Sequence, residues 1–257
     1  MKLGHAIITM IEPMRQSERF AEYNRWYEFD HAYSALMTGP GVFSFRRWVA
    51  PSALKTLRYP NPSTVADPYD AGSFIATYFI AEGMLEEFYN WQSEVLPALI
   101  DAGRMNTDRA HVHTSLYDFV GSVNRAGWPV GDHLALDHPY KGMVALWCDR
   151  DPGTDLHSLG DWLRTTLHPS LTRTDGLVAQ ALTFSPRDMP GIAGSGVGVG
   201  ERVLTQLFLQ CDPRDVWRSD FSDLDRRVRA SGLGSVGLVA PFLPVFAGTT
   251  LYHDQLW

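Results

Sequence analysis

The sequence predicts an α+β protein in which one β-α-β-β-α-β unit occurs twice. Short apolar, β-branched runs alternate with longer helical stretches, and they do so in the same order in both halves. A turn-rich segment with several Gly and Pro residues separates the halves. The length agrees, because 257 residues divide into two units of about 120 residues that could share a sizeable core.

The first half begins with an apolar run at residues 5–11, which predicts a strand that ends at Glu12-Pro13. A helix is expected from Ser17 to Met37, because the strong stop signal Thr38-Gly39-Pro40-Gly41 follows it. Further strands are expected at 42–49, 73–81 and 109–120, a proline-rich loop at 50–72 and a second helix at 84–102.

The second half repeats this order. We expect an N-terminal half at 1–122, a linker at 123–141 and a C-terminal half at 142–257. Strands are expected at 143–148, 177–184, 203–209 and 236–246, and helices at 154–173 and 213–230. The glycine run at 191–200 precedes a strand instead of opening a helix, so it is interpreted as a loop and not as a dinucleotide fingerprint.

The β-α-β-β-α-β order is the ferredoxin-like arrangement, an antiparallel sheet with both helices on one face. The other face of each sheet is bare. Two such faces in one chain can bury each other when they pack sheet to sheet, so the halves are expected to form one cooperative unit. A single doubly wound α/β domain is the alternative, and the short connections between strands argue against it.

The composition narrows the classes of partner. The formal net charge is -7 and the basic residues are scattered, which argues against nucleic acid and against an anionic membrane surface. No apolar run approaches 18 residues, and the N-terminal apolar run is too short for a signal peptide. Cys148 and Cys211 lie in apolar runs and fit buried thiols in a reducing compartment. We therefore expect a cytoplasmic protein.

Residues 25–48, RWYEFDHAYSALMTGPGVFSFRRW, resemble the signature region of the dimeric α+β barrel superfamily, particularly its EthD-like members. The matching positions are Trp26, Tyr27, His31, Pro40, Gly41, Val42 and Arg46. A weaker echo surrounds Trp162 and His168 in the second half. The resemblance implies a fused pair that makes its barrel within one chain, a pocket between the sheet and the helices of each unit, and the possibility of a homo-oligomer.

A group of polar and aromatic side chains shares one face of the first helix. Tyr23, Tyr27, Asp30 or His31, and Ser34 recur there at three- and four-residue spacing. This pattern predicts His31 as a general acid or base, tuned by Tyr27 and Asp30. The alternative is a helix face on which His31 only makes a structural hydrogen bond.

Two histidines on the strand at 109–120 are further candidates. His111 and His113 are two residues apart, so both are expected on one side of the sheet, where one of them would polarise a substrate oxygen together with Tyr27. The pair could also bind a metal, but no Asp, Glu or Cys lies at a characteristic spacing, so no metal site is predicted.

Substrate binding is assigned to Tyr23, Trp26, Tyr78 and Arg46. Arg46 and Arg47 point to opposite faces of their strand, so only one can reach a pocket, where it could hold a carboxylate or stabilise an enolate.

These residues predict a cofactor-free small-molecule enzyme, an isomerase, dehydratase, cyclase or other lyase, that acts on an aromatic or polycyclic apolar substrate. Two alternatives stay open. One is a haem-binding or metal-dependent oxidoreductase of the same fold, because the resemblance includes haem proteins whose axial ligand is a His of the second half, here His168. The other is a non-catalytic protein that binds a small ligand in the same pocket.

Overall fold

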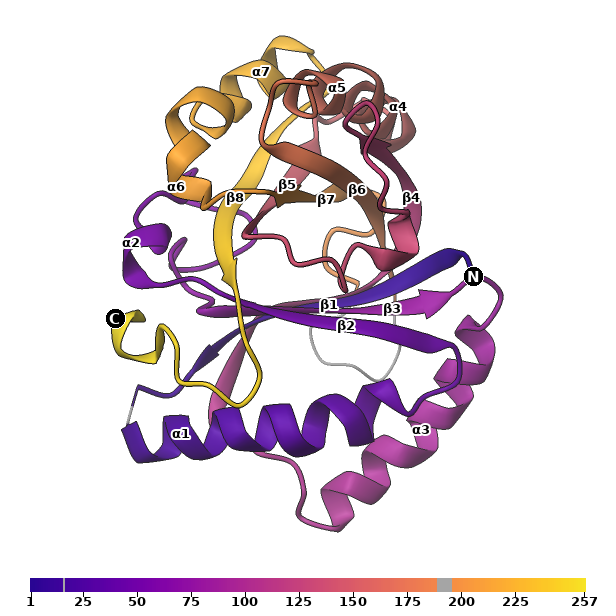
Figure 1. Ribbon diagram of the computed structural model, residues 1–257. Coiled ribbons are helices and arrows are strands. Elements are labelled where there is room, and N and C mark those ends of the chain that lie inside the picture. The colour runs from indigo at the N-terminus through magenta and orange to yellow at the C-terminus, as the bar shows by residue number, and fades with distance from the viewer. Residues whose placement is uncertain (16, 189–195) are drawn as a thin grey trace.

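The computed structural model describes residues 1–15, 17–188 and 196–257. In these residues, eight antiparallel strands close into one barrel in the order β1-β3-β2-β8-β5-β7-β6-β4 (Figure 1). The strands are β1 Leu3–Pro13, β2 Val42–Val49, β3 Phe74–Ala81, β4 Arg109–Asn124, β5 Gly142–Arg150, β6 Val178–Arg187, β7 Arg202–Leu209 and β8 Gly234–Pro244.

Each half contributes four neighbouring strands to the barrel, and the halves meet along two seams. At one seam, β4 and β6 pair over eight positions, from Leu116 opposite Arg187 to Asn124 opposite Gln180. At the other, β2 and β8 pair only at Trp48 and Val49. The prediction of two ferredoxin-like units that share one barrel is confirmed. Closure also pairs the edge strands, which an open sheet would leave free.

Helices cover the outer face of each half, on opposite sides of the barrel (Figure 1). The first half carries α1 Ser17–Trp26, the π-helical segments η1 Tyr27–His31 and η2 Tyr33–Met37, and α3 Leu85–Asp101. The second carries α4 Leu156–Trp162, η4 Leu163–Leu167, α5 His168–Leu171, α6 Pro213–Val216, η5 Trp217–Phe221 and α7 Leu224–Ala230. The short elements are α2 Ser52–Lys55, η3 Asp132–Leu134 and η6 His253–Gln255.

Three of the expected continuous helices therefore contain π-helical turns. Most of residues 17–37, 154–173 and 213–230 is helical as predicted, but each range has at least one segment with the wider i→i+5 turn. Helical periodicity averaged over a whole segment does not reveal these turns, because each is short and lies within an otherwise α-helical stretch.

Large aromatic side chains fill the barrel interior. Trp48 of the first half packs on Phe208 of the second, with ring centroids 6.0 Å apart. Phe79 and Phe184 make a similar contact at 6.3 Å. All four side chains are fully buried. The interior is thus one hydrophobic core built by both halves.

Three smaller expectations concern single segments. Cys148 and Cys211 are buried and free. Within the described ranges, no helix is long and apolar enough to span a bilayer. The predicted glycine loop is described only from residue 196, where a turn leads into β7, and residues 191–195 lie outside the described ranges.

The shared core predicts that the chain unfolds in a single step. Each half alone would expose its interior aromatic face, so the two halves should lose structure together. Urea unfolding followed by far-UV circular dichroism and by tryptophan fluorescence should give coincident transitions. Two separated transitions would show that the halves are independent domains.

Candidate functional site

A cavity of about 230 Å³ lies between the sheet of the first half and its helices. Its apolar lining consists of Ile7, Ile11, Ala35, Leu36, Leu96, Ile100 and Met105. Its polar lining consists of Thr9, Tyr27, His31, Gln92, Arg109, His111 and Thr114. The cavity therefore brings together Tyr27, His31 and His111, which the sequence had singled out.

His31 ends η1 and is held by aromatic rings. Its imidazole stacks on Trp26, with centroids 4.4 Å apart and planes at 23°, and lies 5.4 Å from the ring of Tyr27. Burial, followed by the positive charge of Arg109 and by His111, lowers the pKa of His31 to about 3. Its buried Nδ1 has no hydrogen-bond partner among the described residues. His31 is therefore neutral near pH 7 and has a free ring nitrogen.

Tyr27 is supported from behind by another phenol. The hydroxyls of Tyr27 and Tyr78 lie 2.8 Å apart, and both side chains are buried. Burial raises the pKa of both, so each keeps its proton near pH 7. Tyr27 lines the cavity and Tyr78 does not. If Tyr78 donates to Tyr27, the hydroxyl hydrogen of Tyr27 is free for a ligand in the cavity.

His111 and His113 lie on opposite faces of the sheet, which corrects the prediction. In the pairing of β4 with β1, His113 is opposite Met10 and His111 is opposite Ile11, so Val112 forms a bulge. Because the bulge adds one residue between the two histidines, His111 faces the helices and His113 does not. On the helix side, His111 Nδ1 lies 2.7 Å from Thr114 Oγ1.

His113 instead lies inside the barrel. Its ring packs edge-on against Trp147, and its Nε2 hydrogen-bonds to the hydroxyl of Tyr117. Burial lowers the pKa of His113 to about 3. A cavity ligand on the helix side cannot reach it through the sheet, so His113 belongs to the core.

Arg46 also lies on the unexpected face. It is opposite Thr77 on β3, on the interior side, and its guanidinium lies 5.3 Å from the ring of Trp48. Arg47 faces the helices, but it is buried between rings, 3.8 Å from Phe74 and 4.5 Å from Tyr27. Neither arginine lines the cavity. The register of β2 against β3 decides which of the two arginines faces the helices, and the sequence alone does not determine this register.

Three other predicted residues lie next to the cavity but do not line it. Asp30 accepts hydrogen bonds from Ser34 and Arg104, and the bond from Arg104 is the main cause of its lowered pKa. Trp26 acts through its stacking on His31. Tyr23 is fully buried beside Trp26 and Tyr27.

Sequence reasoning missed Arg109, which lines the cavity at the first residue of β4. Its guanidinium lies 5.0 Å from the ring of Trp26, and its Nε donates to His111 Nε2 at 3.3 Å. The available signal was an Arg two residues before a candidate His at the start of a strand. Gln92, Thr9 and Thr114 carried no signal beyond their polarity.

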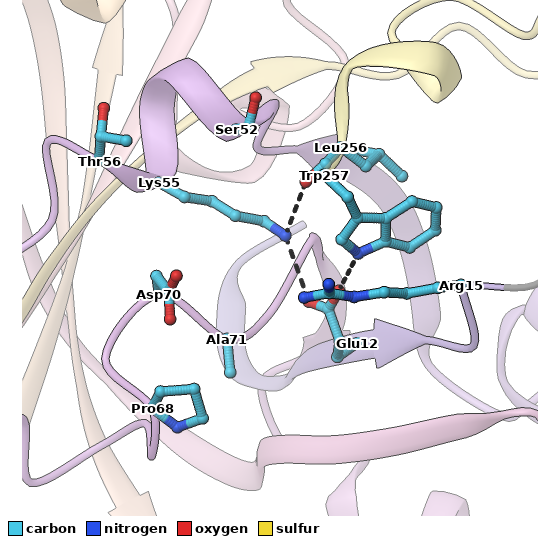
Figure 2. A pocket seen from close by; sticks show the side chains of 10 residues that line it. All are labelled: Glu12, Arg15, Ser52, Lys55, Thr56, Pro68, Asp70, Ala71, Leu256 and Trp257. Carbon is cyan, nitrogen blue, oxygen red and sulfur yellow. Dashed lines mark hydrogen bonds and ion pairs between the residues drawn. The ribbon is translucent and has the colours of Figure 1, made fainter.

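A larger cavity, of about 370 Å³, lies where the C-terminal segment meets α2 and the end of β1 (Figure 2). The buried Lys55 ammonium contacts Ser73 Oγ at 2.6 Å and Leu256 O at 3.1 Å. Its third contact is Glu12 Oε2 at 3.5 Å. Glu12 also accepts a hydrogen bond from Trp257 Nε1 at 2.8 Å. Lys55, Glu12 and Trp257 therefore satisfy one another and anchor the C-terminal segment.

Comparison with solved structures identifies the fold. A chlorite dismutase-like protein matches with a TM-score of 0.54 at 13% identity, covering 99% of this chain and 100% of the other. A monooxygenase-like protein from Fusobacterium nucleatum gives 0.53 at 10%, with 96% and 94% covered. An anthrone oxidase-like protein gives 0.50 at 10%, with 97% and 96% covered. No protein-family model and no curated protein matches the sequence. The chain has the dimeric α+β barrel fold as a fused pair of ferredoxin-like units.

The residues around His168 do not fit a haem, which the resemblance had raised. The His168 side chain is fully buried, and its Nε2 lies 3.2 Å from Thr205 Oγ1. It lines neither the 230 Å³ cavity of the first half nor the 370 Å³ cavity beside the C-terminal segment. An axial ligand needs an open side large enough for a porphyrin, and this imidazole has none. Within the described ranges, no three His, Cys, Asp or Glu side chains are placed to hold a metal ion.

Stability should depend on pH through His168. Burial lowers its pKa from the ordinary 6.5 to about 3. Below pH 6.5, His168 binds a proton in the unfolded chain but stays neutral in the folded chain. The contribution of neutral His168 to the free energy of unfolding is therefore complete above pH 6.5 and is lost as the pH falls toward 3. Between pH 7 and pH 5, wild type should lose about 2 kcal/mol more than His168→Gln in urea unfolding. The exposed-site control His157→Gln should behave as wild type. Identical pH profiles for wild type and His168→Gln would contradict the burial.

The Lys55 contacts predict a cost when the ammonium is removed. Lys55→Met leaves Glu12 and Leu256 O without their partner, and it should lower the free energy of unfolding by about 2 kcal/mol. The exposed Lys2 provides the control variant Lys2→Met, which should stay within about 0.5 kcal/mol of wild type. Urea unfolding of both variants at neutral pH measures the difference. Equal stabilities would show that Lys55 does not anchor the segment.

Proposed function

We propose that the protein is a small-molecule enzyme that moves a proton on an aromatic or polycyclic apolar substrate in the 230 Å³ cavity. The observation that carries this proposal is the meeting of a neutral imidazole, whose Nδ1 has no partner among the described residues, with the Tyr27 hydroxyl inside a mostly apolar cavity. The candidate catalytic residues are His31 and Tyr27.

The second half supports this choice by contrast. The corresponding helix-side space holds the fully buried Leu163, Leu167 and His168, whereas the first half leaves a hollow beside His31. The two units share one topology, but they differ in the space between sheet and helices: the first has a cavity beside His31, and the second has buried side chains around His168. The proposal therefore assigns one functional site per chain, in the first half.

In the proposed reaction, His31 acts as the base. A ring nitrogen takes a proton from a carbon next to a substrate carbonyl, the C–H electron pair moves toward that carbonyl, and its oxygen becomes an enolate. The Tyr27 hydroxyl donates a hydrogen bond to this oxygen, and Tyr78 donates to Tyr27 and so positions it.

The protonated imidazole then completes the reaction. Returning the proton to a different carbon gives an isomerisation. Giving it to a departing hydroxyl releases water and gives a dehydration. An attack of the enolate carbon on a second carbonyl of the substrate breaks that carbonyl's π bond, and the resulting alkoxide takes the proton from the imidazolium, which gives a cyclisation. All three need only the residues of this cavity, which is why an isomerase, dehydratase, cyclase or other lyase is proposed.

The cavity size limits the substrate. Ligand pockets commonly measure about 300–1,000 Å³, so 230 Å³ holds a compact ring system. His111 is exposed at the rim, so further rings would extend past it toward solvent.

Exchange of an acidic C–H tests the proposal without knowledge of the natural substrate. The probe is 2-tetralone, an aromatic ring fused to an enolisable ketone, followed by NMR in D₂O. Wild type should accelerate the exchange, and His31→Ala should reduce the acceleration about 100-fold or more. The control His157→Ala, at an exposed histidine of the other half, should match wild type.

Two outcomes would reject the proposed role. An undiminished rate in His31→Ala would remove His31 as the base. Binding of 2-tetralone to wild type without any accelerated exchange would favour a non-catalytic ligand-binding protein.

A further inference from the structure

Among the described residues that line the cavity, one side chain is charged and none carries the opposite charge. Arg109 is the charged member of its described lining, and no Asp or Glu is part of that lining. The nearest acidic groups are engaged elsewhere. Asp108 pairs with Arg19, and Asp30 pairs with Arg104. Among the described residues, no carboxylate forms an ion pair with Arg109, so its positive charge is left for a ligand in the cavity.

A chain of hydrogen bonds starts at Arg109 as the donor and continues through His111 and Thr114 to Thr9. Because a guanidinium only donates, His111 Nε2 must accept from Arg109 and carry no proton. The imidazole proton is then on Nδ1 and is donated to Thr114 Oγ1 at 2.7 Å. Thr114 keeps its own hydrogen for a second bond, and Thr9 Oγ1 lies 2.7 Å away, where it can accept it.

The last hydroxyl of this chain lies at the cavity. Thr9 lines the cavity, and when Thr114 is the donor between the two hydroxyls, the hydroxyl hydrogen of Thr9 is left for a ligand. Arg109 uses Nε on His111 and Nη1 on Asn106 O, and its Nη2 has no described acceptor. The cavity thus presents a cation and a hydroxyl donor from neighbouring strands, a combination that suits an oxygen with negative charge.

We propose that the ligand is an apolar aromatic ring that carries one anionic oxygen group, a carboxylate or an ionised enol, held by Arg109 with Thr9 as a second donor. This inference rests on the proposed function, because it assigns the substrate class of the same site. The apolar lining from Ile7, Ile11 and Leu96 contacts the ring.

Such a ligand also improves His31 as a base. Arg109 is the second cause, after burial, of the low pKa of His31, and a base with a pKa near 3 is weak at neutral pH. A negative charge next to Arg109 offsets its effect and raises the pKa of His31 toward the working range. A neutral analogue such as 2-tetralone lacks this effect, so His31 acts on it with the lower basicity of the free protein and the acceleration is smaller than with an anionic substrate.

Calorimetric titration at pH 7 tests the inference with three probes of similar shape. 1-Naphthoate carries a carboxylate, 2-hydroxy-1,4-naphthoquinone carries an ionised enol, and 1-naphthalenemethanol is uncharged. Wild type should bind one or both anions about 10-fold or more tighter than the alcohol. Arg109→Gln should lose about 10-fold or more in affinity for that anion, and its affinity for the alcohol should change less than about 2-fold. The exposed-site control Arg25→Gln makes the same change in net charge and should match wild type.

The outcomes separate this inference from the proposed function. Equal binding of alcohol and anions by wild type, or unchanged anion binding in Arg109→Gln, overturns the anionic substrate class and leaves the site in place. Binding of none of the three overturns it as well, and the exchange of 2-tetralone then decides the proposed function alone. If Arg109→Gln does not fold, Thr9→Val replaces it, and it should weaken anion binding about 3-fold or more while sparing the alcohol. Which anion responds identifies the carboxylate or the enol.

Discussion

The barrel, its core and the position of its helices all depend on one interaction, the burial of two sheet faces against each other. Each ferredoxin-like unit leaves one face bare, and the aromatic contacts of Trp48 with Phe208 and of Phe79 with Phe184 bury both faces in one core. Closure of the barrel places the two helical layers on opposite sides (Figure 1). A ligand site between the sheet and the helices is therefore built by the residues of one half only. The packing at this place can then differ between the two halves. The first stayed hollow beside His31, and the second packed His168 into its core.

The two cavities described above differ in how their buried charges are paired. Near the C-terminal segment, Lys55 and Glu12 contact each other and the chain around them, so this pair is structural (Figure 2). In the helix-side cavity, Arg109 has a neutral imidazole as its neighbour and no described acidic partner. A charge that is left unpaired beside apolar walls is costly unless something else pairs with it. That difference, more than cavity size, separates the candidate site from the anchor.

The sequence was sufficient for whatever depended on periodicity. The element order and the placement of Tyr27 and His31 on one helix face follow from the repeats of two and about 3.6 residues, whereas the single shared barrel was implied by the family resemblance. The sequence was insufficient wherever one inserted residue or a shift in strand register decides which face of the sheet a side chain occupies. The bulge at Val112 separates His111 from His113, and it arises from the pairing with β1 and not from the strand's own pattern. The same holds for Arg46, whose face was fixed by the register with β3.

The most direct test of the central claim, that the helix-side cavity of the first half is the ligand site, is a crystal structure of the protein with 1-naphthoate. The account predicts density for the naphthalene ring between β1 and η1, with the carboxylate against Arg109 and the ring beside His31. Density beside His168 in the second half, or in the cavity lined by Lys55, with the first cavity vacant, would contradict it.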